Sequence, residues 1–493
     1  MCGGTVRLGG EADSMKDKAP IFRLLRYSKD AVEKALERGE RFLFEEALPT
    51  MLDELFALAG VLGVWQAIDE LPDPRKSGRG YIPIPIACAL TICRFLYAMD
   101  SFRRVGKIML RDHTLLEKLG VLPTVCENGY YDCARDDDQD EPEEGSKPFD
   151  IEAVLDLLTA LCQEKVQGVI VTFVKALRRR HGQLFRRGLF VMDSNHFRLK
   201  GSKQEYKWCA LMLWTPYGMI PVAMEFSATQ GEGTGETSVG RKLMERVLET
   251  YGEGFVKMLL VDTGYLDGST LHWLKYEHGI DWMMDPRENM AITSSVLEMI
   301  HEKPQRPWHR VEAPRLERPK EQLPARKVMW LGRQRGFDTY GAAVNVTVIW
   351  DHYPPDKEHP EGYDHYEVLL SSRMDWGGVE MHKIWRRRWC IENTFGAMTM
   401  TWGLGKWQIE RLGVYQSTIQ FMALTFGLLV VYLYEQKLKI PLRGIADRLH
   451  RQAKGKMLVL CGGASVIATP AILNDWVGRG LLSRRMSMCG GGP

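Results

Sequence analysis

The sequence predicts an α/β protein whose core is a mixed sheet flanked by helices. Three consecutive strand-like runs are followed by an alternation of helix, strand, helix and strand. A helical region precedes this series, and a β-rich segment interrupts it before a last helical stretch. Because strands that alternate with helices build sheets covered by helices, this order favours a layered α/β fold.

Length and composition describe a soluble chain of several domains. With 493 residues, 45% of them hydrophobic, the chain can bury one large core or two to three ordinary ones. Residues 1–20 lack the apolar run of a secretory signal, and the ten cysteines show no zinc-type spacing, so we expect a cytoplasmic protein with reduced thiols. The apolar stretch 418–434 is expected to be a buried core helix, with a membrane-spanning helix as the alternative.

The formal net charge of +2 is close to neutral, but the charges are unevenly spread. Seven acids fall within residues 136–144, so the rest of the chain is more basic than the total suggests. Basic residues cluster within 178–187, 386–388 and 437–456. Such clusters suit phosphate contacts, although a solvated helix face is the plainer interpretation of any one of them.

The N-terminal part is expected to be mainly helical. We interpret residues 1–41 as a flexible segment and 42–132 as a helical region, because apolar residues such as Leu48, Leu52 and Leu55 recur at helical steps. Residues 133–148 are acidic and nearly devoid of apolar side chains, which is typical of a disordered linker.

Residues 149–288 carry the alternating elements. After a helix over 151–180, strand-like runs cover 189–192, 206–214 and 219–226. We then expect a helix over 236–251, a strand over 256–261, a helix over 269–278 and a strand over 280–284. This order is that of the ribonuclease-H-like fold, although many mixed α/β domains share most of it.

The pattern changes after residue 288. Residues 289–365 hold short strand-like pieces broken by Pro and charged loops, and we interpret them as a β-rich insertion. The domain resumes over 366–437 with a strand at 366–370 and one long helical stretch over 379–400. Residues 438–493 read as a basic C-terminal tail without recognisable chemistry.

Two aspartates directly follow apolar strand runs. Asp193 comes after Leu-Phe-Val-Met and Asp262 after Met-Leu-Leu-Val, which places both carboxylates at strand ends. If the two strands are neighbours, the carboxylates repel each other and stay ionised only with a cation between them. A capping role is the plainer interpretation of either aspartate alone. The pair predicts a site for Mg²⁺ or Mn²⁺.

A third acid lies on the helix expected over 384–393. Trp385, Arg388 and Glu392 recur there at three- and four-residue steps, so one helix face presents an aromatic ring, a guanidinium and a carboxylate. A surface ion pair would explain Arg388 and Glu392 but not the tryptophan beside them.

These segments resemble the DDE transposases of bacterial insertion sequences, specifically the insertion sequence four type with a β-rich insertion before the last acid. The resemblance rests on Phe-Val-Met-Asp-Ser around Asp193, Val-Asp-Thr-Gly-Tyr around Asp262 and the helix with Glu392, and the shared layout spans about residues 84–435.

The chain departs from this family at two positions of its signature helix. The family pattern reads Tyr, Arg, Glu and Lys, where this chain has Trp385, Arg388, Glu392 and Thr399. The tryptophan keeps an aromatic ring without the hydroxyl, and Thr399 cannot supply the charge of the lysine. These two departures affect the residues expected to bind the DNA ends and leave the three acids unchanged.

The resemblance implies a DNA transposase. Asp193, Asp262 and Glu392 would be the catalytic residues and would hold two Mg²⁺ (or Mn²⁺) ions for in-line phosphoryl transfer. The residues expected to contact DNA are Trp385, Arg388, Trp389, Lys207, Arg198 and Arg287. Trp389 could stack on an unpaired base, although a core position is the plainer interpretation.

The expected partners are double-stranded DNA, as transposon ends and as target, and a second copy of this chain on that DNA. Region 42–132 would help to bind the terminal inverted repeats, and the protein would be associated with the nucleoid. No membrane and no small-molecule substrate are expected. A catalytically weak, transposase-derived DNA-binding protein and a two-metal structure-specific nuclease stay open as alternatives.

Overall fold

The structure, a computed structural model, describes residues 29–40, 42–44, 49–74, 82–121, 126, 149–229, 235–265, 267–302, 307–311, 325–355, 359–404, 406–441, 444–449, 457–461 and 464–482. The segment 133–148, expected to be a linker, lies outside the described residues, as does most of the expected flexible segment 1–41. The chain divides into two compact units. Unit 1 comprises Met1–Arg180, Leu199–Ser202 and Ala397–Pro493, and unit 2 comprises His181–Arg198 and Lys203–Gly396.

Unit 2 is built on one mixed sheet of nine strands, in the order β4-β3-β2-β5-β6-β10-β9-β8-β7. Its first five strands along the chain are β2 (Leu189–Arg198), β3 (Glu205–Thr215), β4 (Gly218–Ala228), β5 (Met258–Val261) and β6 (Asp281–Met284). Strands β2, β3 and β4 pair antiparallel, whereas β5 lies parallel to β2 on one side and to β6 on the other. The predicted α/β class with a mixed sheet is confirmed.

Helices connect these strands much as the sequence predicts. The short α10 (Gly182–Phe185) precedes β2, and α11 (Glu236–Tyr251), which has the predicted bounds, packs against β3 and β4. Where one helix was expected before β6, α12 (Gly268–His272) continues as the π-helical turn η3 (Trp273–Glu277). Both faces of β3 are covered, because its residues 207–213 are all buried. This part of the sheet therefore lies in the core of unit 2.

The expected β-rich insertion extends the same sheet. The strand expected over 366–370, where the domain resumes, is β10 (Tyr363–Ser371), which pairs antiparallel with β6 and with β9. The insertion contributes β7 (His309–Arg310), β8 (Ala325–Gln334) and β9 (Val344–Tyr353). The segment also contains α13 (Ala291–Glu302), a helix that the sequence analysis missed although Ile292, Val296 and Ile300 recur at four-residue steps and are buried.

The long helix expected over 379–400 is in fact two helices. α14 (Gly378–Trp385) ends before a turn at residues 386–388, and α15 (Trp389–Trp402) begins after it. The turn is held by backbone hydrogen bonds over three residues, since Arg388 N–H donates to the carbonyl of Trp385 at 2.8 Å. Trp385, Arg388 and Glu392 therefore lie on two helices and the turn between them rather than on one helix face.

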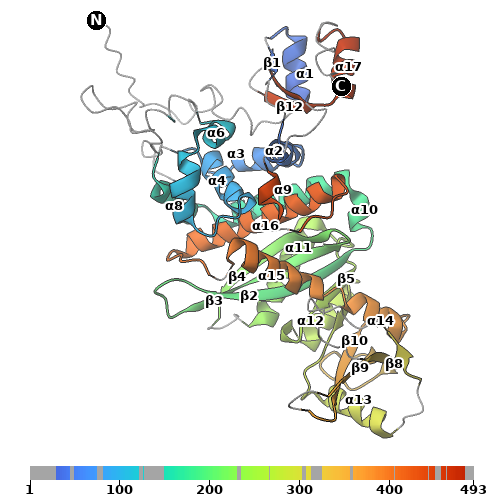
Figure 1. The fold of residues 1–493 in the computed structure, drawn as a ribbon. Helices are drawn as coiled ribbons and strands as arrows, with labels where there is room; N and C mark the ends of the chain where they lie inside the picture. Colours follow the sequence, from blue (N-terminus) through green and yellow to red (C-terminus); the bar gives the residue numbers. More distant parts are fainter. Residues whose placement is uncertain are drawn as a thin grey trace, which may run out of the picture. The chain divides into compact units, whose positions relative to one another are not determined.

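Unit 1 is mainly helical (Figure 1). Its helices are α2 (Met51–Val61), α3 (Val64–Asp69), α4 (Ile84–Leu96), α5 (Phe102–Ile108), η1 (Met109–Arg111), α6 (His113–Lys118), α8 (Ile151–Ala160), α9 (Gln163–Arg180), α16 (Leu412–Glu435) and η5 (Ala446–Arg448). Where one helix over 151–180 was expected, α8 and α9 are separated by a sharp bend. α16 is long and apolar enough to cross a membrane by length and composition, yet 89% of its most apolar window is buried, against α2, α4, α8 and α9.

Two segments far apart in the sequence meet within unit 1. β1 (Phe42–Phe44) pairs with β11 (Met457–Cys461), and β11 pairs with β12 (Ala464–Ala468). α1 (Lys29–Glu37) and α17 (Pro470–Gly478) share one small core with this sheet, which includes Val32, Val459 and Trp476. Part of the expected flexible segment 1–41 and part of the expected tail 438–493 thus have regular structure, because each buries apolar residues against the other.

Candidate active site

Asp193 and Asp262 lie side by side on neighbouring parallel strands. The last parallel pair between β2 and β5 is Met192 with Val261, and the two aspartates are the residues that follow. The condition set in the sequence analysis, that the two strands are neighbours, is met. Asp193 is not at the end of its strand, however, because β2 continues to Arg198 in its hairpin with β3. It sits where the pairing with β5 stops.

The two aspartates have the same local hydrogen bond. Ser194 N–H donates to Asp193 Oδ1 at 2.8 Å, and Thr263 N–H donates to Asp262 Oδ1 at 2.8 Å. Burial raises the pKa of Asp193 to about 6, with the charges of Asp262 and Glu392 adding to the effect and the Ser194 N–H and the charge of Arg388 opposing it. Asp262 and Glu392 are therefore close enough to Asp193 for their charges to raise its pKa.

A third aspartate, Asp285, occupies the corresponding position after the next strand, β6. Asp193, Asp262 and Asp285 thus form a row of acids along one edge of the sheet. The register of β5 with β6 pairs Leu260 with Met283, so Asp262 and Asp285 each follow that pair by two residues. Burial raises the pKa of Asp285 to about 6, with Asp262 adding to the effect and Arg388 opposing it. The sequence analysis missed Asp285, although it follows the apolar run Trp-Met-Met in the way that the other two aspartates follow theirs.

Arg388 and Glu392 form an ion pair at this row of acids. Arg388 Nη2 lies 2.7 Å from Glu392 Oε1, and the two side chains are 12% and 37% exposed. Glu392 lies in the first turn of α15, where the helix dipole favours a negative charge. The ion pair weighed in the sequence analysis is present, with its arginine largely buried.

Trp385 is part of the core of unit 2. It is 2% exposed, and its indole N–H donates to Glu367 Oε1 at 2.6 Å. The guanidinium of Arg388 lies 5.1 Å from the centre of its ring. This position leaves Trp385 no exposed surface for DNA, so its predicted DNA contact has no support in the structure. The ring of Trp385 instead packs against the guanidinium of Arg388.

The other residues expected at DNA differ in exposure. Trp389 is 53% exposed, against the core position that was the plainer interpretation, and Arg198 and Arg287 are exposed as well. Lys207 is 4% exposed and faces His196 across the β2–β3 pair. Its burial argues against a direct phosphate contact by that lysine.

Glu236 is a further acid beside the site. It begins α11, and Ser194 Oγ donates to its Oε1 at 2.7 Å. A Cβ on Gly264 would lie 1.9 Å from its Oε2, so only glycine leaves room for the carboxylate at this point of the Asp-Thr-Gly-Tyr motif. Glu236 therefore contacts Ser194, which follows Asp193 in β2, and packs against Gly264, two residues after Asp262.

The side chains of these acids are of the kind that binds divalent metal ions, but their positions match a metal site only in part. Carboxylate oxygens are the ligands that Mg²⁺ and Mn²⁺ prefer, and a cation would relieve the repulsion that helps to raise the pKa of Asp193. Among the residues that the structure describes, however, no three Asp, Glu, His or Cys side chains are grouped closely enough to hold an ion. Glu392 is paired with Arg388 and would have to leave it to join the aspartates.

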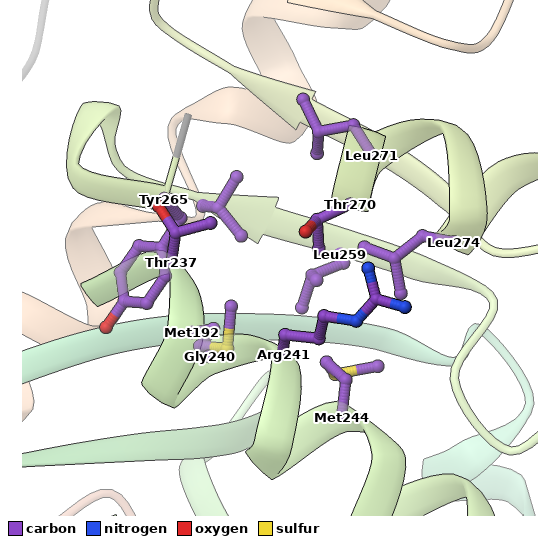
Figure 2. A pocket seen from close by; sticks show the side chains of 11 residues that line it. Met192, Thr237, Gly240, Arg241, Met244, Leu259, Tyr265, Thr270, Leu271 and Leu274 are labelled. Carbon is purple, nitrogen blue, oxygen red and sulfur yellow. The ribbon is translucent and has the colours of Figure 1, made fainter. Parts of the chain in front are cut away.

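Figure 2 shows a small pocket behind this site, between α11, β5 and α12. Met192 and Val261, which directly precede the two aspartates, line it together with apolar residues such as Met244 and Leu271. It contains no carboxylate. The pocket is thus a packing gap beneath the site rather than a place for DNA.

One comparison with known protein families bears on this site. Residues 185–426 match the family model for the transposase DDE domain, and this range contains Asp193, Asp262, Asp285, Arg388 and Glu392. The match supports a DDE transposase, and neither the insertion sequence four type nor a bacterial origin follows from it. No curated protein sequence matches the chain.

Solved structures add a distant similarity. One is the cryo-EM structure of a piggyBac transposase synaptic complex with hairpin DNA, with 10% sequence identity and a TM-score of 0.41, covering 80% of this chain and 79% of the other. A similarity at this level does not establish a shared fold.

Proposed function

We propose that this protein is a transposase that cuts DNA at the inverted-repeat ends of an insertion sequence and joins the freed 3′ ends to target DNA, using two divalent metal ions. The observation that carries the proposal is the register of β2 and β5, which sets Asp193 and Asp262 side by side inside the segment that matches the transposase DDE domain.

We further propose that β2 to β6 and α11 form a ribonuclease-H-like core. Three antiparallel strands come first, and the two later strands lie parallel on the free side of β2, in the order β4-β3-β2-β5-β6. This order and these directions support that fold, because they bring the carboxyl ends of β2, β5 and β6 together at one edge.

In this proposal Asp193 and Asp262 hold the metal ions, and Glu392 joins them once it leaves Arg388. Bound Mg²⁺ or Mn²⁺ would activate water or a DNA 3′-hydroxyl and stabilise the leaving oxygen. The backbone N–H groups of Ser194 and Thr263 hold the two aspartates in fixed orientations. Such preorganisation places the reacting groups before DNA arrives.

Arg388 is the residue proposed to bind a phosphate near the scissile bond, because its planar guanidinium suits phosphate oxygens. Trp389, Arg198 and Arg287 are proposed as further DNA contacts, since all three are exposed within unit 2. The same proposal includes double-stranded DNA as the partner and a dimer of the protein on that DNA. It also includes a role of region 42–132 in binding the DNA ends and a location at the nucleoid.

Cleavage and joining of DNA test the proposal directly. Purified protein would be incubated with DNA that carries its own flanking ends, with Mg²⁺ or with chelator. We expect metal-dependent cleavage and joined products, and we expect Asp193→Asn, Asp262→Asn and Glu392→Gln to lose at least about 100-fold in rate, as removal of a principal catalytic interaction does. Glu380→Gln, an exposed acid on α14, is the matched control and should retain the wild-type rate.

The two alternatives give different products. Free cuts without joined ends would favour a structure-specific nuclease. Binding of the ends without any metal-dependent cleavage would favour a catalytically weak DNA-binding protein. Cleavage that survives in all three acid variants would refute the proposed site.

A further inference from the structure

Two polar atoms beside the row of acids are buried without a hydrogen-bond partner among the described residues. One is the acceptor Asp285 Oδ1, and the other is the donor Arg388 Nε. An unpaired buried group of either kind is destabilising, more so if it is charged, and native structures contain few of them. A donor and an acceptor left unpaired in one site therefore require an explanation.

The two groups are close enough to affect each other. The charge of Arg388 opposes the rise in the pKa of Asp285, just as it opposes the rise in that of Asp193. Arg388 is held at present by its ion pair through Nη2 with Glu392 and by the ring of Trp385. Its Nε edge is still available to a second carboxylate.

In this structure Glu392 Oε1 is taken up by Arg388, so moving the Glu392 side chain to the aspartates means giving up that ion pair. If Glu392 turns toward Asp193 and Asp262, a guanidinium that is 12% exposed loses its ion pair. Leaving such a charge buried and unpaired is strongly unfavourable, so in the absence of a DNA phosphate Glu392 leaves readily only if another carboxylate accepts the arginine. Asp285 is the acid at the site that neither the ion pair nor the proposed metal ligands use.

We propose that Asp285 is a positioning residue that takes Arg388 as its partner when Glu392 turns to the metal ions. Asp285 then stabilises the metal-bound arrangement without touching metal or DNA. This inference rests on the proposed metal site. It explains why both Asp285 Oδ1 and Arg388 Nε lack partners in the arrangement where Arg388 still holds Glu392.

The test measures Mn²⁺ binding to the full-length protein by calorimetry, without DNA or turnover. Asp285→Asn removes the charge and keeps the shape of the side chain. We expect it to weaken Mn²⁺ binding by about tenfold or more, the usual effect of losing a residue that orients a metal ligand. Glu288→Gln, an exposed acid three residues away, is the matched control and should bind Mn²⁺ like the wild type.

A second background separates positioning from direct ligation. In Arg388→Ala nothing holds Glu392 back, so adding Asp285→Asn should leave the Mn²⁺ affinity unchanged. If Asp285 ligated the ion itself, Asp285→Asn would weaken Mn²⁺ binding equally in the wild type and in Arg388→Ala. That result would overturn the proposal. An unchanged affinity of the single variant would overturn it as well.

Thermal melting of the metal-free protein provides the control for folding. Asp285→Asn removes a buried carboxylate whose Oδ1 has no partner, so its melting temperature should equal or exceed that of the wild type. A lower melting temperature would mean that Asp285 already pairs with Arg388 without metal, against the inference. If the wild type bound no Mn²⁺, the proposed function would fail rather than this inference.

Discussion

A buried ion pair in the extended part of the sheet offers the sharpest test of how unit 2 is held together. Arg326 on β8 donates from Nε and Nη2 to the two carboxylate oxygens of Asp351 on β9, at 2.6 and 2.5 Å. The side chains are only 11% and 3% exposed. Asp351→Asn leaves the guanidinium buried without its counter-charge, and breaking such a pair costs about 3–5 kcal/mol.

Thermal and urea unfolding would measure this loss, with Asp364→Asn as the matched control. Asp364 lies on the adjacent strand β10 and pairs with His352 at 2.8 Å, but these two side chains are 43% and 47% exposed, so its removal should cost less than about 1 kcal/mol. At roughly 2–4 °C per kcal/mol for a unit of this size, Asp351→Asn should lower the melting temperature by ~10 °C. A fall no larger than that of the control would refute the reasoning.

Two further predictions concern other parts of unit 2. Gly268→Ala should lower the free energy of unfolding in urea by more than about 2 kcal/mol, because the new Cβ would lie 2.3 Å from the backbone of Thr339. The control Gly396→Ala has open space in α15 and should be neutral or stabilise by up to about 1 kcal/mol. Equal effects of the two substitutions would contradict this prediction. Burial, helped by Arg326, lowers the pKa of His382 from 6.5 to about 4. The unfolded chain therefore binds more protons between these values, and stability should fall from pH 6.5 to pH 4, by at most about 3 kcal/mol, with a flatter profile in His382→Asn.

The elements that the sequence predicts well are those with local signals. α11 has the predicted bounds, and the strands β2 to β6 lie where apolar, β-branched and aromatic runs stand in the sequence. The pairing of β1 with β11 joins residues more than 400 positions apart and has no local pattern. The turn at residues 386–388 carries neither Pro nor Gly, the usual signs of a helix break.

The candidate site was predictable to the extent that its residues follow strands. Asp193 and Asp262 could be paired from sequence because each ends an apolar run, and the same signal was present at Asp285. The burial of Trp385 was not predictable, because its partner Glu367 lies on β10, which only the pairing with β6 brings beside the site. A spacing pattern along one helix cannot show which face a neighbouring strand covers.

This pairing also explains how the chain can tolerate 100 residues, 286–385, between Asp285 and the turn that carries Arg388. β10 returns beside β6 with Leu370 opposite Met284, the residue just before Asp285. The junction is fastened by side chains as well, since Ser372 Oγ accepts from Trp282 N–H at 3.0 Å and donates to Asp281 Oδ1 at 2.9 Å. The chain therefore leaves β10 from a point that β6 determines. The intervening segment can vary in length without moving Arg388 and Glu392 away from the row of aspartates, as long as β10 keeps its place.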